Sequence, residues 1–165
     1  MLYFAVALTV LIAVLVLLYL LLQGAIFVPT PHSEVEDIIS LSGIKKGEKV
    51  ADLGSGDGRI VLAFAKKGAQ ADGFEINPVL VKLSRSKIKA EDVEGNARIH
   101  FGSFWRANLK QYDVVVVFGI SYIMARLERK LRVELKPGAR VIANIFPFPK
   151  WKYLKKIGGL YLYIN

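Results

Sequence analysis

The residues best suited to chemistry form a glycine-rich stretch, Asp52-Leu53-Gly54-Ser55-Gly56-Asp57-Gly58-Arg59. It overlaps the end of a short apolar run, Lys49–Leu53, that predicts a buried parallel strand, and it precedes a helical pattern from Ile60 to Lys67. Glycines at alternate positions between a strand and a helix let the backbone approach a ligand closely. The helix N-terminus adds free N–H groups. The stretch therefore predicts a ligand-binding turn.

Two common nucleotide-binding motifs do not fit this turn. The nicotinamide fingerprint, Gly-x-Gly-x-x-Gly, requires a third glycine at position 59, where the chain has Arg59. A phosphate loop is excluded because no Gly-Lys-Ser/Thr follows Gly47 and Lys49. The octet Asp52–Arg59 instead resembles the first motif of class I S-adenosylmethionine-dependent methyltransferases. This resemblance implies S-adenosyl-L-methionine as the cofactor.

The elements around the turn alternate between strand and helix patterns. An earlier helix is predicted over Glu34–Leu41, capped by Ser33 and ended by Gly43. Further strands are predicted over 69–76, 97–101, 112–118 and 139–145, further helices over 79–90 and 123–135, and a terminal hairpin over 151–157 and 160–164. This order predicts an α/β fold with a doubly wound, mainly parallel sheet and right-handed crossovers, the Rossmann-like fold that the resemblance also implies.

In such a sheet, ligands bind beyond the carboxyl ends of the strands. Glu75 ends the second strand, where its carboxylate is expected to accept hydrogen bonds from two ribose hydroxyls; otherwise it is a solvated acid. Asp52 either organises the turn or accepts from the cofactor's ammonium, and Asp57 is a candidate cap of the next helix. The candidate cofactor-binding residues are Asp52, Gly54, Ser55, Gly56, Asp57, Gly58, Glu75, Ile76, Asn77, Ser103, Phe104, Phe118 and Gly119.

The chain also resembles a narrower family, the membrane-anchored protein lysine methyltransferases that modify the mitochondrial ATP synthase c-subunit and the adenine nucleotide translocase. The resemblance runs from Val28-Pro29-Thr30-Pro31 to the end, through Gly73-Phe74-Glu75-Ile76-Asn77-Pro78 to Phe146-Pro147-Phe148-Pro149-Lys150-Trp151, its most family-specific piece. It implies methyl transfer to lysine. Thr30 either closes over the cofactor or only spaces the anchor from the domain.

The segment after the third strand departs from this family. The family usually has an acidic residue at position 103 to hold the adenine amino group, and Ser103 would hold that group more weakly. Phe104 or Trp105 could stack on the adenine base, or both could be ordinary core residues.

The residues predicted to face the substrate come from the later strands. Lysine methylation needs a neutral amine in line with the methyl group, so no side-chain base is expected. The candidate substrate channel consists of Phe118, Tyr122, Asn144, Phe146, Pro147, Phe148 and Trp151. Asn144 and the carbonyls near Gly119 and Pro147 are candidate acceptors for the amine. Alternatively, these aromatics pack the terminal strands. His32 and His100 have no metal-like spacing, and no metal is predicted.

The first part of the chain is strongly apolar, with no charged residue from Leu2 to Leu22. A run of ~20 apolar residues can cross the ~30 Å core of a bilayer. It is too long for the apolar region of a signal peptide, and no basic residues precede it. We expect a transmembrane anchor at residues 1–24, a linker and helix at 25–47, and a methyltransferase domain at 48–165. All 23 lysine and arginine residues lie at or beyond Lys45, which predicts a single-pass cell-membrane protein with its catalytic domain in the cytoplasm.

The composition limits the remaining classes. The 165-residue chain has no cysteine, which excludes disulfides, thiolate metal sites and a cysteine nucleophile. Its net charge is +9, and no acidic residue follows Glu134. The late basic residues (Lys136, Arg140, Lys150, Lys152, Lys155 and Lys156) suit anionic lipid, worth ~1 kcal/mol per charge near the surface. RNA binding and an ordinary solvated face are the alternatives.

These observations predict a membrane-anchored methyltransferase that modifies lysine in a membrane-embedded or membrane-adjacent protein. Its partners would be the bilayer and that protein, rather than nucleic acid. Two other functions stay open: a methyltransferase for RNA or a small molecule, and a non-catalytic membrane assembly factor with the same fold.

Overall fold

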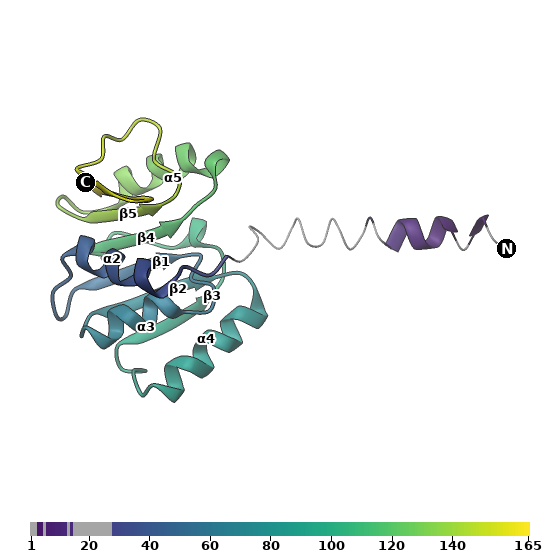
Figure 1. Ribbon diagram of the computed structural model, residues 1–165, viewed down its shortest axis with the longest axis horizontal. Coiled ribbons are helices and arrows are strands. Elements are labelled where there is room, and N and C mark those ends of the chain that lie inside the picture. The colour runs from purple at the N-terminus through teal and green to yellow at the C-terminus, as the bar shows by residue number, and fades with distance from the viewer. Residues whose placement is uncertain (1–2, 5, 13, 15–27) are drawn as a thin grey trace.

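A computed structural model describes residues 3–4, 6–12, 14 and 28–165 of the chain (Figure 1). In this part of the chain a seven-stranded sheet has the order β3-β2-β1-β4-β5-β7-β6. The strands are β1 (Lys49–Leu53), β2 (Gln70–Glu75), β3 (Ala97–Phe101), β4 (Val114–Phe118), β5 (Arg140–Asn144), β6 (Lys155–Ile157) and β7 (Leu160–Ile164). Strands β1 to β5 are parallel, whereas β7 runs antiparallel to β5 and to β6. The predicted α/β fold with a mainly parallel sheet is confirmed.

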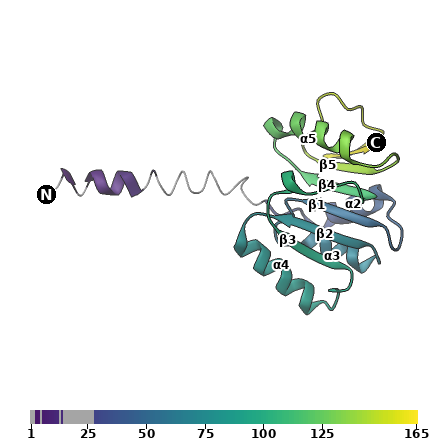
Figure 2. The same cartoon turned by 180° about the vertical axis from the view of Figure 1, so that it is seen from behind.

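Helices cover both faces of the sheet. They are α2 (His32–Ser42), α3 (Arg59–Lys66), α4 (Pro78–Ala90) and α5 (Ser121–Glu134), with a short 3-10 turn, η1 (Phe104–Arg106). A first core cluster joins α2, α3 and α4 to one face through Ile38, Phe64 and Val81. A second core cluster joins α5 to the other face through Met124 and Leu127. Figure 2 shows from behind that α5 lies toward β5 while α3 and α4 lie toward β2 and β3.

The four valines of β4 show how the sequence builds this core. Val114 and Val116 belong to the first cluster, and Val115 and Val117 belong to the second. All four are at most 1% exposed. Because a strand points successive side chains to opposite faces, an unbroken apolar run is buried only when both faces are covered. Each buried valine stabilises the fold by roughly 1.5–3 kcal/mol relative to exposure.

The start of α2 differs from its prediction. The helix begins at His32 with Pro31 at the N-cap, and no side chain caps it, so the predicted cap by Ser33 is wrong. The carbonyl of Pro31 accepts the first helical hydrogen bond, from the Val35 amide at 3.1 Å, and the Pro31 ψ of 151° keeps the chain extended before the helix. The predicted end at Gly43 is confirmed by its left-handed φ of 55°. The helix packs against α3, β5 and β7.

The predicted anchor at residues 1–24 falls mostly on residues outside this description. Within the described ranges, we find no helix both long enough and apolar enough to span a membrane.

Candidate functional site

The glycine turn follows β1 at the carboxyl edge of the sheet. Gly54, Gly56 and Gly58 all have positive φ, at 91°, 53° and 79°, a conformation in which a side chain would be strained. A Cβ on Gly58 would lie 2.7 Å from the Cβ of Ser84, so this glycine also lets the start of α3 approach α4. At Gly54, by contrast, no described atom lies within 4 Å of where a Cβ would be. The turn therefore has open space beside its bare backbone.

Glu75 holds the turn in place from the end of β2. Its Oε2 accepts a hydrogen bond from the Gly56 amide at 2.9 Å, and its Oε1 accepts one from the Asn77 amide at 2.7 Å. Asn77 in turn caps α4, since its Oδ1 accepts from the amide of Val79 at 2.9 Å. Each carboxylate oxygen can accept more than one hydrogen bond, so Glu75 can still receive ribose hydroxyls. The sequence did not reveal that Glu75 also organises the turn.

Asp52 is a buried carboxylate that lacks a partner. It is 3% exposed and makes no hydrogen bond or ion pair with any described residue. Burial, followed by the charges of Glu75 and Asp57, raises the pKa of Asp52 from 3.8 to about 7. A positively charged ligand at the turn would supply the missing partner. Of the two predicted roles of Asp52, this environment suits contact with a cation better than organisation of the turn.

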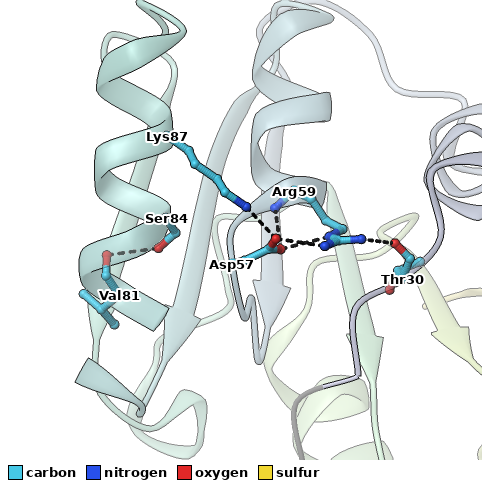
Figure 3. A network of polar contacts seen from close by, with 6 residues as sticks. All are labelled: Thr30, Asp57, Arg59, Val81, Ser84 and Lys87. Carbon is cyan, nitrogen blue, oxygen red and sulfur yellow. Dashed lines mark hydrogen bonds and ion pairs between the residues drawn. The ribbon is translucent and has the colours of Figure 1, made fainter. Parts of the chain in front are cut away.

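Asp57 is the centre of an ion-pair network that ties three elements together (Figure 3). Its Oδ2 accepts from Arg59 at 2.9 Å and from Lys87 of α4 at 2.6 Å. Burial alone would raise the pKa of Asp57, but hydrogen bonds and charges from Arg59 and Lys87 outweigh it and hold the pKa well below its usual range. Gly58, not Asp57, occupies the N-cap of α3, and the Arg59 amide is 3.4 Å from Asp57 Oδ1. The ion pairs are the stronger feature.

The same arginine fixes the segment before α2. Arg59 Nη1 donates to the carbonyl of Thr30 at 2.7 Å, and Thr30 is 7% exposed (Figure 3). One feature of the sequence pointed to a role for this arginine, its position two residues after Asp57 in the glycine motif. No feature of the sequence pointed to the ion pair between Lys87 and Asp57, because the two residues are 30 positions apart.

The adenine side of the predicted site contains partly buried aromatic rings. Ser103 Oγ accepts from the Trp105 amide at 3.4 Å and caps η1. The rings of Phe104 and Trp105 lie 4.9 Å apart, and the guanidinium of Arg126 lies 4.3 Å from the Trp105 ring centre. Both rings pack against the second core cluster. Both rings thus pack on protein groups, and stacking of Phe104 or Trp105 on the adenine base stays a prediction.

Two further predicted cofactor residues lie at neighbouring strand ends. Ile76, after β2, is 40% exposed. Gly119 follows β4, and a Cβ there would collide with Met124 Sδ, so this glycine lets α5 begin close to the strand.

The structure divides the predicted substrate channel into buried and accessible residues. Phe148 and Trp151 are 4% and 8% exposed and lie 4.9 and 5.3 Å from the Tyr163 ring. Trp151 Nε1 also donates to the Ile164 carbonyl at 3.3 Å. These two rings pack in the second core cluster between α5 and β7. The connection from β5 to β6 contains no described helix, and the two rings cover this part of the sheet instead. Of the other channel residues, Phe118 and Phe146 are partly buried, and Tyr122 and Pro147 are exposed.

Asn144, the last of these residues, ends β5 beside Phe118 of β4. It is 2% exposed, and its Oδ1 is buried with no hydrogen-bond partner among the described residues. The next residue, Ile145, has a φ of 66°, which is strained for a β-branched side chain. The carboxyl edge thus has a polar side chain without a partner two strands from the glycine turn, in addition to Asp52 and the buried Ser55 Oγ at the turn.

Comparison with known proteins gives a consistent result. The chain matches the family profile described as the ANTKMT methyltransferase domain over residues 52–155. The ATP synthase c-subunit lysine N-methyltransferase of Mus musculus is 46% identical over 125 residues, which are 76% of this chain and 50% of that protein. A protein-lysine N-methyltransferase of Saccharolobus islandicus is 34% identical over 127 residues, 76% of this chain and 79% of that protein. This chain spans about half the length of the mammalian c-subunit methyltransferases that it matches.

A solved structure with a similar fold is also that of a methyltransferase. The crystal structure of an RNA methyltransferase from Salinibacter ruber, in complex with S-adenosyl-L-homocysteine, has a TM-score of 0.80 and 30% sequence identity. The similarity covers 83% of this chain and 93% of that chain.

Proposed function

The chain belongs to the ANTKMT methyltransferase domain family, and we propose that it is an S-adenosylmethionine-dependent methyltransferase that modifies lysine side chains of a protein. The observation that carries the proposal is the set of groups around the glycine turn. Asp52 is buried without a partner, Glu75 has acceptor capacity to spare, and the space beside Gly54 is open. These three features fit the donor's positive charge, its ribose and its close approach to the backbone.

The donor, when bound, supplies a methyl group on a positively charged sulfur. The chain's own residues then have to present a neutral amine, because a free lysine has a pKa of about 10.4. Burial of the amine at the carboxyl edge and a nearby positive charge both favour loss of its proton. What remains is placement of the nitrogen in line with the methyl group. No obligatory base is required, and we assign none.

Lysine is the preferred acceptor because relatives at 46% and 34% identity are named lysine methyltransferases. A second candidate is RNA, favoured by the name of the Salinibacter ruber protein at 30% identity. Lys150, Lys152, Lys155 and Lys156 also form no ion pair with a described residue, which would leave their charges available to phosphates.

Membrane attachment is part of the proposal. The apolar run of residues 1–24 and the absence of lysine and arginine before Lys45 support a single-pass anchor with the domain in the cytoplasm. The late lysines would then lie near anionic lipid. An enzyme held at the bilayer meets membrane-embedded proteins at a raised effective concentration.

A transfer experiment tests the function. Membranes from cells that lack this gene are incubated with methyl-labelled S-adenosylmethionine and the full-length chain in detergent. We expect the label in a protein band, where mass spectrometry should identify it as methyl-lysine. The label should be lost with the variant Glu75→Ala. The control Glu94→Ala removes an exposed carboxylate and should leave transfer unchanged. Label confined to RNA would favour the second candidate, and no transfer by a folded chain would favour the assembly factor.

A further inference from the structure

The end of β5 has an unusual combination of burial and missing contacts. A buried amide that makes no hydrogen bond destabilises the fold, so such groups normally find a partner. Asn144 is 2% exposed, yet its side chain bonds to no described residue. Its backbone carbonyl accepts a hydrogen bond from the Phe146 amide at 2.8 Å. The side-chain oxygen is left for a ligand.

The backbone beyond Asn144 is held in a costly conformation. Ile145 adopts a φ of 66° although its side chain is β-branched and 49% exposed. Its amide donates to the Gly159 carbonyl at 2.8 Å, which keeps the bend in place. Such strain persists only where the surroundings enforce it. Here it fixes the direction in which the chain leaves Asn144.

The position of Asn144 relative to the glycine turn is set by strand register. Leu53, directly before the turn, pairs with Val117 of β4, and the next residue, Phe118, pairs with Asn144. Two strand spacings of ~4.8 Å therefore separate β1 from β5, so the amide lies roughly 10 Å from the turn. Partly buried Phe118 stands between them. A donor held at the turn and an amine at Asn144 would meet above β4.

We propose that the side-chain amide of Asn144 receives the ε-amino group of the substrate lysine, and that its neutrality keeps this amine uncharged. The inference rests on the proposed function and specifies its acceptor subsite. An amide oxygen can accept a hydrogen bond from the amine and orient the lone pair, but it adds no negative charge. A carboxylate at this place would stabilise the ammonium form, which cannot attack.

The reaction balances with these groups alone. The ammonium first loses its proton to water. The nitrogen lone pair forms the N–C bond as the C–S bond of the sulfonium donor breaks. The electron pair of that bond stays on sulfur, which leaves as a neutral thioether, and the positive charge ends on the methylated nitrogen.

Other titratable groups near this edge belong to the elements packed against β5, which are β4, β7, α2 and, on the other face, α5. Helix α5 carries Tyr122, Arg126, Glu128, Arg129, Lys130, Arg132 and Glu134. Strand β4 has no titratable residue, and Tyr161 and Tyr163 of β7 pack with the second core cluster. Helix α2 carries His32, Glu34, Glu36 and Asp37. All of these are shared by the wild-type chain and by variants at position 144, so a difference between their pH profiles reports on that position.

The test compares Asn144→Asp and Asn144→Ala with the full-length chain. Single-turnover methyl transfer to lysine in the same membranes is followed at saturating donor from pH 6 to 10. We expect Asn144→Ala to slow transfer about tenfold, and Asn144→Asp to move the rising limb of the rate upward by about one pH unit. Donor affinity by calorimetry should be unchanged for Asn144→Ala. The matched control, Asn108→Asp, changes an exposed asparagine and should keep the wild-type profile.

Three results would overturn the inference. If both variants bind donor and keep the wild-type rate and pH profile, Asn144 does not contact the amine, and the proposed function stands. If Asn144→Ala loses donor binding, the residue serves the donor site or the fold. If the wild-type chain binds donor but methylates no lysine, the proposed function fails and the inference fails with it.

Discussion

The carboxyl edge of the sheet has two halves that differ in how completely their polar groups are paired. Around β1 and β2, Glu75 bonds two backbone amides, and Asp57 bonds two cationic side chains. Around β4 and β5, the amide of Asn144 has no described partner, and the neighbouring Ile145 is strained. Most polar groups of the first half are paired within the chain, apart from Asp52 and the buried Ser55 Oγ, whereas the one polar side chain that ends β5 has no partner among the described residues.

This difference matches the two ligands of the proposed reaction. The donor is one small molecule of constant shape, so a preformed site binds it without reorganisation. The acceptor is a side chain that enters from a different protein, and its amine can complete the hydrogen bonds of the second half. Asp52 and the Ser55 Oγ are the exceptions in the first half, and the missing partner of Asp52 is a charge that only the donor brings.

The strongest test of a preformed donor half is Glu75→Gln. A glutamine would turn its NH₂ group toward either the Gly56 or the Asn77 amide, so two donors would face each other. We expect the free energy of unfolding to fall by about 1–3 kcal/mol and donor affinity to fall about 100-fold. Calorimetry and thermal denaturation measure the two effects. Wild-type affinity in this variant would mean that the donor does not use Glu75, and Glu94→Gln is the exposed control.

A smaller effect is expected from Asp52→Asn, which tests whether the Asp52 carboxylate binds the donor's positive charge. The folded chain holds a proton on Asp52 up to about pH 7, whereas the unfolded chain releases it near pH 3.8. Between these values the fold loses stability as pH rises, and the loss stays complete above about pH 7. The variant should therefore be more stable than the wild type at pH 8.

The same variant should bind the donor about tenfold more weakly at pH 8, because the cationic donor then loses its carboxylate partner. For the wild type we expect donor affinity to rise between pH 6 and 8. This rise should be absent in the variant. Calorimetry in buffers of different ionisation enthalpy measures the proton released on binding. Equal proton release by both chains would exclude Asp52 as the group that titrates.

The smallest effect is expected from Ile145→Gly in the second half. Glycine adopts a φ of 66° without strain, and the exposed isoleucine side chain loses little packing. We expect the free energy of unfolding to rise by up to about 1 kcal/mol, while methyl transfer slows because Asn144 is held less firmly. Asp92→Gly relaxes the other described non-glycine residue with positive φ, away from this edge, and is the control. A faster enzyme would show that the strain does not serve the acceptor half.

Much of the fold followed from the sequence because short apolar runs bounded by glycine or proline determine strands in a parallel sheet. The predicted bounds of the strand at Lys49–Leu53 were confirmed without change. The ion pair between Asp57 and Lys87 could not be predicted, since it depends on how α4 lies over the turn. The aromatic hexapeptide marked the family correctly, but burial of Phe148 and Trp151 depends on how α5 packs over β7. The donor and acceptor roles of individual residues stay predictions.

The contact between Arg59 and Thr30 also limits how far the enzyme can reach. It holds the segment before α2 beside the glycine turn at the carboxyl edge of the sheet. If the residues before Val28 hold the bilayer as proposed, the short stretch of chain from Val28 to Thr30 would keep the glycine turn near the lipid. Lysines in loops close to the membrane surface would then fall within range, whereas those on distant soluble domains would not.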